Sequence, residues 1–152
     1  MGEGVRALKI YLPLAVLFFL VATTGVDIFA RIKIAGEPFA QALKESLYWS
    51  GVQFVMTIML LVPFVLIALI CAYGQKRAPG LRIAVIFAIA MVPLLYFYVD
   101  GHFAAQQAMK AEHWTAAALS VGLLPFFIGA PVVLLTFGVT AAVAGFDRDA
   151  QD

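Results

Sequence analysis

Residues that could bind a metal ion or carry protons gather in one polar stretch, residues 100–113. Carboxylates and imidazoles are metal ligands, and histidine titrates near neutral pH. If residues 102–113 form a helix, its two histidines lie about 16 Å apart along the axis and cannot share an ion. A hairpin loop would bring them together. The sequence therefore assigns no metal and no cofactor, and the competing interpretation is ordinary polar residues at a membrane surface. The four candidates are Asp100, His102, Glu112 and His113.

A second candidate is Asp27, the acid that lies deepest in an apolar segment. Arg31 follows it by four positions and Thr23 precedes it by four, so the three share one helix face. A charge at the bilayer centre costs about 2.5–3.5 kcal/mol, and less near the surface. We expect Asp27 to pair with Arg31. The functional alternative is an acid that carries a proton or binds a substrate.

A polar stripe precedes and enters the second apolar segment. Its members recur at helical spacing, and we expect them to face the other helices, because Gln53 would lack hydrogen-bond partners in lipid. The stripe could simply join helices by hydrogen bonds. Together with Asp27 and Thr23 it could instead line a polar or ion path. Its members are Ser46, Ser50, Gln53 and Thr57.

Four long apolar segments carry or flank these residues. The first three approach the length of about 20 residues that crosses a hydrocarbon core of about 30 Å. Tyrosine and tryptophan stand at several segment ends, as is typical of side chains at the headgroup level. The sequence predicts an all-α membrane protein, with residues 1–152 forming a single integral membrane domain built as a four-helix transmembrane bundle. The expected spans are residues 12–30, 50–73, 83–99 and 114–145.

The fourth segment is unusual, because it would measure about 48 Å as a straight helix. Pro125, Gly129 and Pro131 lie within seven positions of one another. One interpretation is a single helix that is kinked at Pro125 and Pro131. The other is a pair of half-helices that meet near Gly129, as in some transporters.

Two connecting stretches are predicted to be helical as well. Glu37 and Pro38 resemble a helix start, and apolar residues then recur at helical spacing towards the second span. Residues 103–113 are rich in good helix formers. We therefore expect helices two and four to extend beyond the bilayer on the same side.

Composition defines the surroundings of the chain. It is 64% hydrophobic and 12% charged, whereas a soluble domain has about 25% charged residues. The expected partner is thus the lipid bilayer, and a net charge of +1 offers no surface for nucleic acid. The single Cys71 excludes an intramolecular disulfide and a thiolate metal site.

Lysine and arginine counts indicate an orientation. Six of them lie on the side of the N-terminus and four on the other, which favours both termini in the cytoplasm. Size and helical character suggest a bacterial inner membrane. The first set is Arg6, Lys9, Lys76, Arg77, Arg82 and Arg148, and the second is Arg31, Lys33, Lys44 and Lys110.

No phosphate-binding loop or catalytic triad spacing is present, so an enzyme is disfavoured. Small residues recur four apart at Gly138 and Ala142 and at Ala141 and Gly145, which allows close helix approach. We expect a non-catalytic accessory, interaction or inhibitory subunit that binds other membrane protein subunits or itself. The alternatives are a small transporter or channel component, using Asp27, Gln53 and a broken fourth helix, and a membrane enzyme or metal protein using the acids and histidines of residues 100–113.

Overall fold

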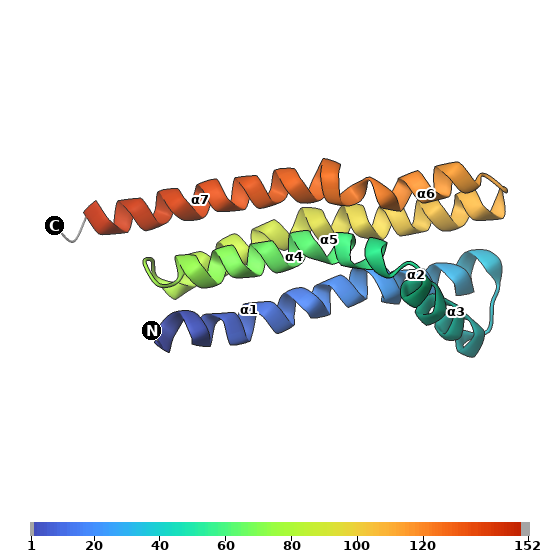
Figure 1. The fold of residues 1–152 in the computed structure, drawn as a ribbon, viewed down its shortest axis with the longest axis horizontal. Coiled ribbons are helices and arrows are strands. Elements are labelled where there is room, and N and C mark those ends of the chain that lie inside the picture. Colours follow the sequence, from blue (N-terminus) through green and yellow to red (C-terminus); the bar gives the residue numbers. More distant parts are fainter. Residues whose placement is uncertain (1, 150–152) are drawn as a thin grey trace.

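The computed structural model describes residues 2–149, and over that range it contains helices and no strands. Four helices are long and apolar enough to cross a membrane, so the predicted four-helix membrane bundle is confirmed. The start of the first helix, the turn of residues 75–79 and the end of the last helix lie at one end of the bundle (Figure 1). The spans are Val5–Ala35, Phe54–Gly74, Gly80–Lys110 and Trp114–Gly145.

The first span is a continuous rod with two wider turns. It consists of α1 (Gly2–Leu20), the π-helical turn η1 (Val21–Gly25), α2 (Val26–Ala30) and the π-helical turn η2 (Arg31–Ala35). In η1 the Thr23 hydroxyl donates to the Phe19 carbonyl at 2.8 Å, and such side-chain bonds compete with regular helix hydrogen bonding. The rod ends at Gly36, whose φ of 72° is left-handed and suits a residue without Cβ.

The expected extension of the second helix is wrong in one respect. Residues 39–52 are helical, as α3 (Phe39–Val52), but this helix is separate from α4 (Phe54–Gly74). Gln53 breaks the path with φ −97° and ψ 40°. Because of this break α3 runs obliquely to α4 at the end of the bundle opposite the termini (Figure 1).

Residues 103–113 were expected to extend the fourth helix, but residues 103–110 belong to the third span instead. α5 (Gly80–Lys110) has 31 residues, or about 46 Å, and it outruns a core of about 30 Å. It ends because Glu112 takes a φ of 60° and the His113 amide turns back to the Ala108 carbonyl at 2.8 Å. The helix formers of residues 103–110 therefore prolong the third span.

The fourth span begins at Trp114, as predicted. It consists of α6 (Trp114–Gly122), the π-helical turn η3 (Pro125–Gly129) and α7 (Ala130–Asp149). Pro125 lacks an amide proton, and the wider turn starts at that residue. The segment is one continuous, distorted rod, which agrees with the kinked helix and not with two separated half-helices.

Aromatic packing joins the spans in the core. Tyr98 of α5 is fully buried, and its hydroxyl donates to the Leu60 carbonyl of α4 at 3.1 Å. Its ring lies 5.1 Å from that of Phe64, which in turn lies 5.7 Å from Phe19 of α1. These edge-on contacts fix the relative depth of three spans.

Candidate functional site

A buried arginine organises the polar end of the bundle. Arg31 exposes only 10% of its side chain. Its Nε donates to Oδ2 of Asp27 at 3.0 Å, and its Nη1 donates to Oε2 of Glu45 at 2.8 Å. Glu37 adds a longer ion pair at 3.6 Å. Gln106 completes the group, which we call the Arg31 cluster (Asp27, Arg31, Glu37, Glu45 and Gln106), by donating to Oδ1 of Asp27 at 2.6 Å.

Four different segments supply this cluster. Asp27 and Arg31 stand one helical turn apart in the first span, so the expected pairing between them is confirmed. The left-handed turn at Gly36 reverses the chain and brings Glu45 of α3 back against the arginine. Gln106 reaches in from α5 because that helix continues past the core. The cluster therefore ties α3 and the long ends of two spans together.

The electrostatics of the cluster are uneven. One guanidinium faces three carboxylates, which leaves a formal charge of two negative units. Within the described residues, the buried Oε2 of Glu37 has no hydrogen-bond partner. Lys110 lies at the same end, but its Nζ donates to the Ile34 carbonyl at 3.0 Å. The arrangement is well suited to holding helices in register, since each bond joins a charged group to a nearby partner.

The candidate polar path is not assembled. Gln53 is exposed at the break between α3 and α4, so the expectation that it faces the bundle is wrong. Because α3 and α4 are separate helices, the polar stripe of α3 does not continue along α4. The Thr57 hydroxyl donates to the carbonyls of Ser50 at 3.0 Å and Gln53 at 3.2 Å, which satisfies the broken end of α3. Thr23 bonds within its own helix rather than to Asp27.

The acids and histidines of residues 100–113 are dispersed by the long α5. Asp100 is exposed on its outer face, whereas the half-buried His102 places Nδ1 2.7 Å from the Tyr98 carbonyl. Glu112 and His113 are exposed in the turn beyond the helix. Among the side chains that the structure describes, residues 5–145, there is no group of three or more histidine, cysteine or acidic residues arranged to hold a metal ion.

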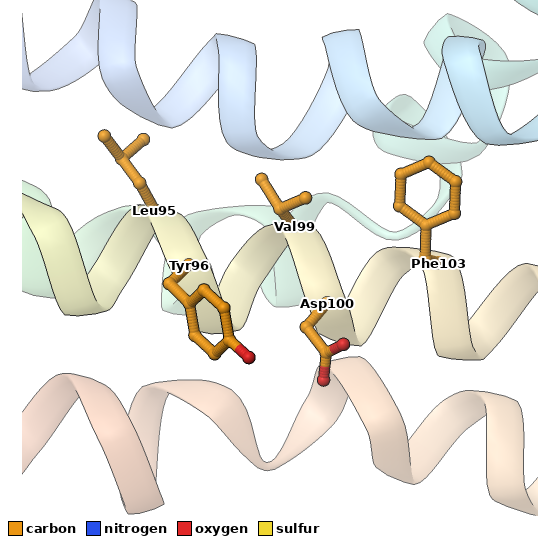
Figure 2. Close-up of a pocket in the computed structure, with 5 residues that line it drawn as sticks. All are labelled: Leu95, Tyr96, Val99, Asp100 and Phe103. Atoms are coloured by element: carbon orange, nitrogen blue, oxygen red, sulfur yellow. The ribbon is translucent and has the colours of Figure 1, made fainter.

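A shallow groove runs along the outer face of α5. Figure 2 shows the side chains of Leu95, Val99 and Phe103 directed towards the first span, and those of Tyr96 and Asp100 directed towards the fourth. Asp100 makes no hydrogen bond or ion pair with any part of the chain that the structure describes. It is thus an unpaired carboxylate in a membrane-spanning helix.

The outer face of α7 exposes a row of small residues. Gly138 and Gly145 have no neighbouring atom within 4 Å of the place where a Cβ would stand. Ala141 and Ala142 between them are exposed as well, and Leu134 is 69% exposed one turn before Gly138. The small residues that the sequence singled out therefore lie on the surface and do not contact another span.

Sequence reasoning missed Gln106, Glu37 and Glu45. Gln106 had a weak signal, because it directly follows the small residues Ala104 and Ala105 in a stretch of good helix formers. That signal requires knowing that α5 continues to Lys110.

No protein family, curated protein or solved structure matches this chain.

Proposed function

We propose that the protein is a non-catalytic accessory subunit that binds another integral membrane protein through the outer face of α7. The observation that carries the proposal is the exposed row of small residues from Gly138 to Gly145. In lipid, close packing of helix backbones is a main source of association, and glycine and alanine permit it. Exposed to lipid alone, these residues offer little packing surface.

The poor coverage of the fourth span supports the same proposal. Only 17% of its most apolar stretch is buried, compared with 22% for the first span and 33% for α4 and for α5. A partner helix along α7 would cover this side.

The finer localisation belongs to the proposal. We place the protein in a bacterial inner membrane on its size and helical character. We place both termini in the cytoplasm because six lysine and arginine residues lie at the end that holds the start of α1 and the 75–79 turn. A reporter that is active only in the periplasm can be fused to the C-terminus. Activity of that fusion would contradict this orientation.

Two matched substitutions test the binding face. Ala141→Leu fills the outer face of α7, whereas Ala88→Leu makes the same change at an exposed site of α5. We expect tagged protein purified in mild detergent to carry a different integral membrane protein in stoichiometric amount, which Ala141→Leu removes and Ala88→Leu leaves. A second copy of this chain in its place would make the face a self-association surface instead. A wild-type protein that is monomeric and free of partners would overturn the proposal. If both variants retain the partner equally, the interface does not lie on the outer face of α7.

A further inference from the structure

The groove on α5 combines two groups that attract cations. Tyr96 and Asp100 stand four positions apart and therefore on the same face of the helix. Their hydroxyl and carboxylate project to the same side, towards the fourth span (Figure 2). Tyr96 is 66% exposed, with its ring packed edge-on with that of Phe97 at 5.1 Å, and the Asp100 carboxylate has no partner among the described residues. A carboxylate beside an open aromatic face suits an ammonium ion.

The depth of Asp100 limits which ammonium can reach it. Arg82 and Asp100 are the nearest charged residues on α5 that bracket its apolar middle, and they lie about 27 Å apart along the helix. A hydrocarbon core of about 30 Å then places Asp100 at its edge. Asp100 also lies about 9 Å deeper than Gln106, which belongs to the Arg31 cluster. An unpaired acid at this level is unfavourable in lipid and needs a counter-ion.

The groove continues from Asp100 towards the bilayer centre along apolar side chains. Leu95 and Val99 precede Asp100 on α5 and so lie towards the bilayer centre, and Val92 is 65% exposed farther along. Phe103 lines the groove one turn beyond Asp100, so the carboxylate stands among apolar side chains, and the Leu95 and Val99 side of the groove faces the acyl chains. It is open sideways between the first and fourth spans (Figure 2).

We propose that this groove binds a phospholipid with a primary-ammonium headgroup, of the phosphatidylethanolamine class. The ammonium donates hydrogen bonds to the Asp100 carboxylate and lies against the Tyr96 ring, while one acyl chain follows Val99 and Leu95. A choline headgroup has no N–H to donate, and a phosphatidylglycerol headgroup has no cation. A lysine from a partner helix would supply an ammonium too, but its helix would have to enter between two spans at headgroup depth.

The experiment uses the full chain, delipidated in mild detergent, with synthetic phospholipids of identical acyl chains. Bound lipids are counted by native mass spectrometry as the headgroup changes from ethanolamine through its mono- and dimethyl forms to choline. We expect affinity to fall with each lost N–H, and the whole series to span at least about tenfold, since a hydrogen bond to a charged group contributes that much. Equal binding of the ethanolamine and choline lipids would overturn the proposal.

Variants then locate the site. Asp100→Asn should abolish the preference for ethanolamine, Tyr96→Leu should weaken it and Tyr96→Phe should keep it. Glu112→Gln is the matched control, because Glu112 is an exposed acid beyond α5 and outside the groove. Asp100 is exposed, so Asp100→Asn should fold, and protection of the buried Cys71 from alkylation verifies this. An unchanged preference in Asp100→Asn overturns the assignment. Loss of a co-purifying membrane protein from Asp100→Asn, without any lipid preference in the wild type, would assign the groove to a protein partner instead.

Discussion

Gln106 of α5 donates from Nε2 to Oδ1 of Asp27 in α2 at 2.6 Å, across 79 positions of the chain. The other carboxylate oxygen accepts from Arg31 at 3.0 Å. Both oxygens of the deepest acid in the first span are therefore used inside the molecule. The bond also joins the first span to the third near the end of each.

The first prediction concerns this bond. Gln106→Ala should lower the free energy of unfolding by about 1.5–3 kcal/mol, because it removes a donor from a half-buried carboxylate. Gln107→Ala is the control, since Gln107 is exposed next to it on the same helix while Gln106 is only 7% exposed. The rate of alkylation of Cys71, the single and fully buried cysteine, measures unfolding in detergent. Equal effects of the two changes would show that the bond contributes nothing.

The second prediction concerns the arginine. Arg31→Ala leaves the carboxylates of Asp27, Glu37 and Glu45 without their shared cation, and we expect a loss of about 3–5 kcal/mol, as when one partner of a buried ion pair is removed. Thermal unfolding followed by circular dichroism measures it.

The control for Arg31→Ala is Lys33→Ala, which removes an exposed cation from the same turn. The Lys33 ammonium lies 5.8 Å from the Phe29 ring, a contact expected to contribute about 0.5–1 kcal/mol at an exposed site. A loss in Arg31→Ala as small as this would mean that the three carboxylates find other partners.

Local rules were enough for the part of this site that lies within one helix. Asp27 and Arg31 pair because residues four apart share a helix face, and the sequence alone predicts that. Glu45 and Gln106 reach the arginine through a chain reversal at Gly36 and through the length of α5. Neither the chain reversal nor the length of α5 can be predicted from the spacing of neighbouring residues. The cluster as a whole was therefore not predictable from the sequence.

The same distinction explains the errors in the helix extensions. The four apolar spans follow from hydropathy, which depends on composition over a window. The ends of helices depend on single residues instead. Gln53 and Glu112 are ordinary helix residues by propensity, yet both are exposed where one helix gives way to the next, at φ −97° and φ 60°. A polar stripe that was continuous in the sequence was therefore divided between two helices.

The third prediction concerns the close approach of the fourth span to α4. A Cβ on Gly129 would overlap the ring of Pro63, which cannot rotate away. Gly129→Ala should therefore destabilise the bundle by about 1–3 kcal/mol, as overpacking does. Gly138→Ala is the matched control, because nothing lies within 4 Å of its Cβ position. Midpoints of thermal unfolding compare the two, and a Gly129→Ala protein as stable as Gly138→Ala would contradict the packing.

The fourth prediction places α3 in the headgroup region of the membrane. Both ends of α3 are joined to spans at the same end of the bundle, and its inner side is held by the bond from Arg31 to Glu45. Its outer side exposes aromatic rings, with Tyr48 64% and Trp49 46% exposed. Tyrosine and tryptophan are favourable at the membrane surface, where the ring contacts acyl chains and the polar atom contacts water.

The fluorescence of Trp49 measures its depth. Trp114→Phe leaves Trp49 as the single tryptophan, since the chain has two. In vesicles, a spin label near the headgroup should quench Trp49 more strongly than a label deep on the acyl chain. The reciprocal variant is Trp49→Phe, in which Trp114 reports the level at which α5 ends and α6 begins. Quenching of Trp49 by aqueous iodide but by neither lipid label would place α3 outside the membrane. Stronger quenching by the deep label would place it among the spans, and either result would contradict the prediction.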